Sequence, residues 1–158
     1  MLPVLGDDHD LNHGDVVVFA PAVLNDRPEP GQEDDWHPVF EYLTLLDPAG
    51  FTTYWIDGCC PDDDTWYALR GALQEAGYAV WAYSGDHYRI TDPHHEGETL
   101  PGIYAALGVP PTSSAKEADA LLTELTAHWP HPLAWPALAE AAGADPARHR
   151  KIVDDYDL

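Results

Sequence analysis

Residues 51–77, FTTYWIDGCCPDDDTWYALRGALQEAG, contain the clearest pattern in the chain, an apolar run followed by a capped amphipathic segment. Residues 51–56 are aromatic and β-branched, which predicts a strand. Asp62, Asp63 and Asp64 then offer an N-cap and favourable negative charge in a first helical turn. The apolar residues after them recur at helical spacing, and they are Trp66, Leu69, Leu73 and Ala76. Gly77 is suited to end the helix, so the segment predicts a strand and then a helix.

Further strands are predicted before this segment. Residues 39–46 form another apolar run, and the turn sequence Asp47-Pro48-Ala49-Gly50 connects it to residues 51–56. Proline at the second turn position and glycine at the fourth predict a hairpin. Residues 15–20 are largely β-branched and predict a buried strand that ends at Pro21.

After the helix, the pattern predicts two more strands and then only helices. Residues 78–83 and 87–91 flank Ser84-Gly85-Asp86, as in a hairpin or in closely following strands. A capping box, Ser114 with Glu117, and an N-cap followed by proline, Asp145-Pro146, mark two helix starts. Helices are expected over residues 101–107, 115–128, 136–142 and 146–154.

This order of elements predicts an α+β fold. We expect a mainly antiparallel sheet of about five strands, with one central helix and a C-terminal group of short helices packed on it. At 158 residues the chain has a common single-domain size, so one domain over residues 1–158 is expected. Within it we expect a flexible N-terminal arm at 1–14, sheet plus helix at 15–92 and a helical part at 100–158.

The charge of the chain is strongly one-sided. Twenty-eight acidic and seven basic residues give a net charge of −21, which repels phosphate and anionic lipid and attracts basic partners. Direct binding to nucleic acid is therefore disfavoured, and adaptation to high salt is an alternative explanation of the acidity. No segment resembles a membrane span or an export signal, and the adjacent Cys59 and Cys60 cannot link distant segments. These features predict a cytoplasmic protein without a membrane partner.

Imidazole and carboxylate groups gather in two segments. The loop after the predicted strand at 87–91 contains Asp92 and Glu98 near four candidate metal ligands, which are His87, His94, His95 and Glu96. A metal-dependent or acid/base enzyme that uses the loop at 86–98, with a divalent metal as its cofactor, is one hypothesis. The other segment contains Asp7, Asp8, His9, Asp10 and His13. Glycines at both of its ends argue against a helix there, so a solvated acidic arm is the simpler interpretation.

The cysteine pair and the C-terminal helical segment each have a functional and a purely structural interpretation. Cys59 and Cys60 precede a helix start, but three neighbouring carboxylates disfavour a thiolate, so no nucleophile is expected there. Residues 136–152 resemble a helix-turn-helix, with Ala139 four residues before Gly143 and DNA-facing residues at 146–152. The basic residues of that segment are Arg148, Arg150 and Lys151. His149 stands where this motif normally buries an apolar side chain, and a helical hairpin that closes the fold is the alternative.

The leading hypothesis needs no catalytic residue and no cofactor. Carboxylates on a rigid fold can satisfy the Lys and Arg side chains that otherwise meet phosphate, as in an immunity protein, an inhibitor or a mimic of DNA. The expected partner is a basic protein such as a nuclease, a toxin or a nucleic-acid-binding protein. The candidate contacts come from the acidic loop at 25–38 and from the helix start, and they are Glu33, Asp34, Asp35, Trp36, Asp62, Asp63 and Asp64. We expect Trp36 to act as an aromatic anchor, and Trp55, Trp66 and Trp81 to lie in the core.

Overall fold

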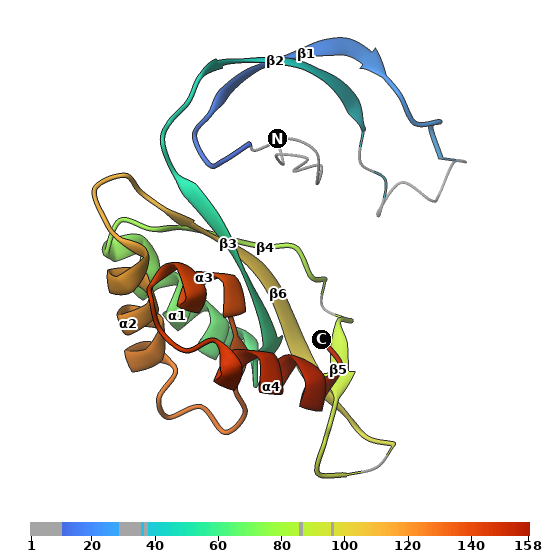
Figure 1. Cartoon of the computed structure of the whole chain (residues 1–158). Helices are drawn as coiled ribbons and strands as arrows, with labels where there is room; N and C mark the ends of the chain where they lie inside the picture. Colours follow the sequence, from blue (N-terminus) through green and yellow to red (C-terminus); the bar gives the residue numbers. More distant parts are fainter. Residues whose placement is uncertain (1–10, 29–35, 37, 86, 96) are drawn as a thin grey trace. The chain divides into compact units, whose positions relative to one another are not determined.

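The computed structural model describes residues 11–28, 36, 38–85, 87–95 and 97–158 (Figure 1). Contacts within the chain divide it into two compact units, Met1–Phe51 and Thr52–Leu158. Whether the two units behave as the single domain expected from the sequence stays a prediction.

The first unit contains a two-stranded antiparallel ribbon. β1 (Val16–Val23) pairs with β2 (Phe40–Asp47). The start of the ribbon is held by Asp15, whose carboxylate accepts hydrogen bonds from the backbone N–H groups of Asn12 and Ala49 at 2.8 and 2.7 Å. A two-stranded ribbon is at best marginally stable by itself in water, so these side-chain bonds to its connecting segments matter for its shape.

The second unit is built on a five-stranded antiparallel sheet. Its strands are β3 (Thr52–Cys59), β4 (Ala79–Ala82), β5 (Arg89–Thr91), β6 (Thr99–Val109) and β7 (Leu133–Ala134). Their order is β4-β6-β3-β7, and β5 also pairs with β6. β6 is the longest strand and pairs with β3 along the whole of β3, from Thr52 opposite Val109 to Cys59 opposite Gly102. The α+β class predicted from the sequence is confirmed.

Four helices complete this unit, and they are α1 (Asp63–Glu75), α2 (Ala115–Leu125), α3 (Pro136–Ala141) and α4 (Ala147–Tyr156). α1 begins as predicted, because Asp62 Oδ1 accepts the N–H of Thr65 at 2.7 Å, and Gly77 follows its end with φ of +90°. α2 has the predicted capping box in both directions. The helices expected at residues 115–128, 136–142 and 146–154 are confirmed to within a few residues at their ends.

Two apolar clusters hold the second unit together. The larger one joins inward residues of the sheet, such as Ile56 and Leu107, to helix residues such as Leu73, Leu122 and Leu138, all fully buried. α1, α2 and α3 contribute to this cluster, and they lie against the sheet in Figure 1. The smaller cluster packs α4 against the strands through five residues, which are Cys59, Ile90, Ala134, Ile152 and Tyr156.

Aromatic side chains of β3 and β6 contact each other across the sheet. The Trp55 ring stacks on the Tyr104 ring, with centroids 4.9 Å apart. Trp66 is buried as predicted, but the core positions predicted for Trp55 and Trp81 are wrong, since these residues are 37% and 48% exposed. Successive strand residues point to opposite faces of a sheet, so Trp55 next to the buried Ile56 cannot share its environment.

The helix predicted at residues 101–107 is wrong, because this segment lies inside β6. A short apolar run fits a buried strand or a buried helix equally well, and periodicity does not separate the two. The glycine in this run serves close packing instead, since a Cβ at Gly102 would lie 2.6 Å from Cδ1 of Tyr88. The helical part of the chain therefore begins at α2 and not at residue 100.

The strand partners also differ from the prediction. The hairpin expected across residues 47–50 is wrong, because β2 pairs with β1 whereas β3 pairs with β6 and β7. β4 and β5 follow each other closely, as the second alternative allowed, and both pair with β6. β1 does not end at Pro21, although proline has no backbone N–H to donate to a neighbouring strand. The pairing of β1 with β2 is irregular between Phe19 and Val23, so the missing N–H of Pro21 removes no hydrogen bond between the strands.

Candidate functional site

The acidic start of α1 is exposed, and its three aspartates have different roles. Asp62 caps the helix, and this backbone hydrogen bond from Thr65 lowers the pKa of its carboxyl group. Asp63 and Asp64 lie in the first turn and are also exposed. No ion pair joins either of them to a basic side chain in the described part of the chain. Asp62 is therefore needed for the helix, whereas Asp63 and Asp64 present their charge to solvent.

Aromatic and apolar groups lie next to these two carboxylates. Tyr67 is 61% exposed, and its spacing from Asp63 and Asp64 places all three on neighbouring positions of the helix surface. A shallow hollow lies between α1 and the end of α2, and it is lined by Thr65, Ala68, Leu69, Leu125 and Trp129. Asp64 is one turn before Ala68, so a carboxylate stands at the border of an apolar depression.

The other half of the predicted partner-binding surface is described only at Trp36. Glu33, Asp34 and Asp35 lie outside the described residues. The indole N–H of Trp36 donates a hydrogen bond to the backbone oxygen of Asp26 at 2.8 Å, and the residue is half-buried. Trp36 therefore stabilises its own loop, and its predicted role as an anchor stays a prediction.

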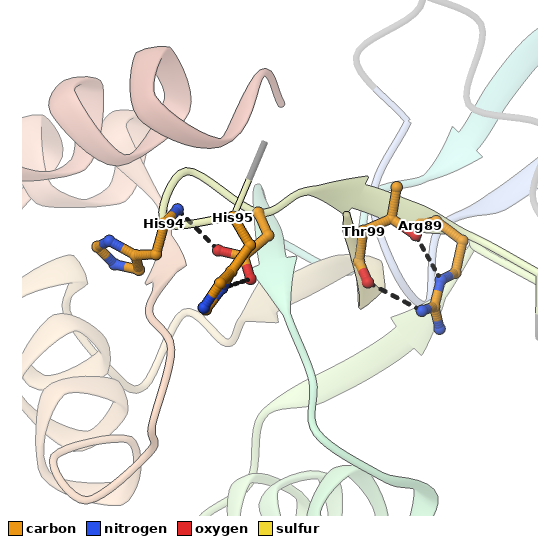
Figure 2. Close-up of polar contacts among 5 residues, drawn as sticks. Arg89, His94, His95 and Thr99 are labelled. Carbon is orange, nitrogen blue, oxygen red and sulfur yellow. Dashed lines mark hydrogen bonds and ion pairs between the residues drawn. The ribbon is translucent and has the colours of Figure 1, made fainter. Parts of the chain in front are cut away.

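The loop between β5 and β6 is organised around one buried carboxylate. Asp92 is 6% exposed, and its two oxygens accept from the backbone N–H of His94 and meet Nδ1 of His95, each at 2.9 Å. Figure 2 shows that His95 contacts Asp92 through its ring, whereas His94 contacts Asp92 through its backbone N–H. The backbone N–H of Asp92 donates to the oxygen of Glu98 at 3.1 Å, which closes the loop.

This arrangement affects the charge of both partners. The backbone hydrogen bond from His94, followed by the contact with His95, lowers the pKa of Asp92. The same contact with Asp92 raises the pKa of His95. Arg89, on the preceding strand, donates its hydrogen bonds to Thr99 at 3.0 and 3.3 Å (Figure 2).

The structure groups a different set of donor atoms in this loop from the set predicted from the sequence. The donor atoms of three residues, Asp92, His95 and Glu98, lie within 4.8 Å of one another. His95 belongs to the predicted set, but His87 and His94 are not part of this group, and Glu96 lies outside the described residues. The N-terminal candidates at residues 7–10 also lie outside the described residues. Asp92, His95 and Glu98 are spaced three residues apart, and this spacing is the sequence signal that could have selected the group.

Burial disfavours the thiolate form of both cysteines. Both are buried, and burial raises the pKa of each thiol to about 11. The thiolate is the nucleophilic form, so almost none of it is present near neutral pH.

One polar contact within the sheet region was not predicted. The Tyr88 hydroxyl donates to Asp57 Oδ1 at 2.9 Å, and Asp57 Oδ2 lies 3.1 Å away. Burial raises the pKa of Asp57, and burial together with this carboxylate raises the pKa of Tyr88 to about 12. The two residues are far apart in sequence, and no local pattern connects them.

The C-terminal helix pair has one basic residue, Arg148, that forms no ion pair within the described residues. Two of the three basic residues in α4 form ion pairs with acidic side chains, Arg150 with Glu140 at 3.3 Å and Lys151 with Asp155 at 2.6 Å. His149 is 5% exposed, and its Nδ1 accepts the backbone N–H of Trp135 at 3.3 Å. These contacts favour the alternative interpretation, a helical hairpin that closes the fold.

None of the helices in the described part of the chain has the length and apolar character of a membrane span. Comparison of the chain with protein-family models, with curated proteins and with solved structures finds no match.

Proposed function

We propose that this chain is an acidic binding protein that acts by electrostatic occupancy of a basic partner, such as a nuclease, a toxin or a nucleic-acid-binding protein. The observation that carries the proposal is the exposed pair Asp63 and Asp64, which no basic side chain of the described residues neutralises. Both are fixed in the first turn of α1 by the cap at Asp62. Carboxylates held in this way meet Lys or Arg side chains with little loss of conformational entropy.

The surroundings of this pair suit a long basic side chain. Lys and Arg combine an apolar stem with a charged end. The hollow beside Asp64 offers apolar groups of Leu125 and Trp129 to such a stem, and Tyr67 adds an exposed ring. A guanidinium group in this position would meet a carboxylate and an aromatic side chain together.

The distribution of basic residues supports the same conclusion. Lys151 and Arg150 form their ion pairs at α4, away in sequence from the acidic turn. With a net charge of −21, the chain has a long-range field that accelerates encounter with a basic protein.

The test is capture of a partner from lysate of the source organism, followed by a measurement with the partner that is recovered. The purified chain is mixed with lysate at low salt and at about 150 mM salt, where the Debye length is near 8 Å. One basic protein that stays bound at the higher salt is the expected result. Its affinity is then measured for the double variant Asp63→Asn, Asp64→Asn.

The matched control is the double variant Glu41→Gln, Asp154→Asn, which removes the same charge from two exposed positions elsewhere. Because a charged hydrogen bond contributes about 1.5–3 kcal/mol, the first variant should weaken binding by at least about tenfold and the control by less than about threefold. Equal weakening by both variants would show that net charge alone acts. Recovery of only a salt-labile mixture of basic proteins would favour adaptation to high salt.

A further inference from the structure

The loop between β5 and β6 has properties that the proposed function does not use. It brings one imidazole and two carboxylates together within seven residues. We propose that Asp92, His95 and Glu98 bind one divalent transition-metal cation, with Zn²⁺ as the type ion. One nitrogen and two oxygen donors form a ligand set that Zn²⁺ accepts, with the fourth position left for water.

The distances allow such a site after small side-chain movements. Zn²⁺ lies about 2.1 Å from nitrogen or oxygen ligands, so two ligands of a tetrahedral site are roughly 3.4 Å apart. The three donor atoms here lie within 4.8 Å of one another. Asp92 is held by the backbone of His94, but the side chains of His95 and Glu98 are exposed and able to rotate. The 2.9 Å contact of His95 with Asp92 must widen slightly, and rotation of the Glu98 side chain can bring its carboxylate to ligand distance.

A second observation points to a cation at this position. The carboxylate of Asp92 is buried, yet within the described residues no Lys or Arg forms an ion pair with it. The ion pair that it forms within those residues is with the imidazole of His95, whose side chain is 66% exposed. The backbone N–H of His94 and the ring of His95 already stabilise this buried carboxylate, and a full positive charge beside it would stabilise it further. A proton on His95 supplies one such charge, and a divalent metal supplies two at the same place.

The metal would have to compete with that proton. The hydrogen bond to Asp92, with a smaller contribution from Glu98, raises the pKa of His95 and so favours its protonated form. The metal ligand is the neutral imidazole. The ring of His95 therefore has to be neutral to bind the metal, while His94 contributes only its backbone N–H to Asp92.

The experiment uses the full chain, freed of metal with a chelator. Zn²⁺ is titrated in by calorimetry at about 150 mM KCl, which screens non-specific attraction to the acidic surface, and Co²⁺ is followed by its visible absorption. One ion per chain is the expected result. Loss of an outer partner of a metal ligand commonly weakens binding 10–100-fold, so His95→Ala and Glu98→Gln should each weaken it at least about tenfold.

The matched controls are the two other histidines of the region. His94→Ala keeps the backbone hydrogen bond to Asp92, and His87→Ala removes an exposed ring outside the ligand group, so both should bind within about twofold of the wild type. His95 and Glu98 are exposed, so their variants should fold, and circular dichroism of each variant checks this. Equal weakening by His94→Ala and His95→Ala, several weak ions per chain, or no binding at millimolar Zn²⁺ would overturn the proposal.

Discussion

Gly58 is the position at which one added methyl group should most clearly disturb the fold. It has φ of +141°, and a Cβ there would lie 2.6 Å from the backbone oxygen of Pro132 and 2.9 Å from Cα of Leu133. Both atoms belong to the backbone at β7, and Gly58 is opposite Leu133 in the β3–β7 pairing. Backbone atoms cannot rotate away as a side chain would, so Gly58→Ala should push β7 from the sheet.

The expected cost has two parts. An L-residue forced into a rarely populated backbone conformation costs about 1–3 kcal/mol, and overpacking typically costs another 1–3 kcal/mol. We therefore expect Gly58→Ala to lower the free energy of unfolding by roughly 2–6 kcal/mol, a large share of the 5–15 kcal/mol typical of a domain.

Substitutions at two other glycines distinguish the cost of backbone strain from the cost of overpacking. Gly71 lies inside α1 with open space at its Cβ position, so Gly71→Ala should stabilise the chain by about 0.5–1 kcal/mol. Gly77 has φ of +90° but also open space, so Gly77→Ala should show the backbone strain alone. Urea denaturation followed by tryptophan fluorescence and far-UV circular dichroism measures all three. A cost below about 1 kcal/mol for Gly58→Ala would refute the close approach of β7 to β3.

Two further predictions concern the second unit. All buried apolar residues of the described chain lie between Ile56 and Tyr156. A fragment of residues 52–158 should therefore unfold cooperatively on heating, with a midpoint temperature within about 5 °C of that of the full chain. Loss of the cooperative thermal transition would contradict this prediction. Burial lowers the pKa of His149 in the folded state, so between this lowered pKa and about pH 6.5 the unfolded state binds a proton that the folded state does not. The free energy of unfolding should therefore decrease as the pH is lowered through this range, by at most about 1.4 kcal/mol per pH unit. Chemical denaturation between about pH 5 and 8 should show a shallower pH dependence of this free energy for His149→Gln than for the wild type. Equal slopes for the two proteins would contradict the assignment.

The elements that could be predicted from the sequence are those with local signals. α1 has an aspartate cap, helical apolar spacing and a glycine after its end, and α2 has a capping box. These signals act within a few residues, so tertiary contacts had little opportunity to override them.

The errors concern interactions between distant segments. The turn at residues 47–50 has hairpin chemistry, but the partner of β2 is β1 and the partner of β3 is β6. The run inside β6 was ambiguous between helix and strand, and it is fixed as a strand by pairing on both of its sides. Neither fact is encoded by residue spacing within the segment itself.

The candidate sites also combine features with a local sequence signal and contacts that depend on the fold. The loop with His95 could be identified from its composition, but the choice among its donors depended on the backbone closure from Asp92 to Glu98. Asp57 on β3 and Tyr88 before β5 lie on opposite sides of β6, and the Tyr88 side chain reaches Asp57 across Gly102 of β6. No pattern in the sequence indicated this contact.

The acidity of this chain has more than one physical origin, and this limits what net charge says about function. Several carboxylates accept backbone N–H groups at the ends of elements, among them Asp15, Asp62, Asp92, Glu117 and Asp145. These groups would be useful to the fold in a protein of any net charge, because helix starts and turns leave N–H groups without backbone partners. A binding surface has to be sought among the carboxylates that remain after such roles are assigned. Asp63 and Asp64 meet that criterion, and Asp62 beside them does not, although all three look alike in the sequence.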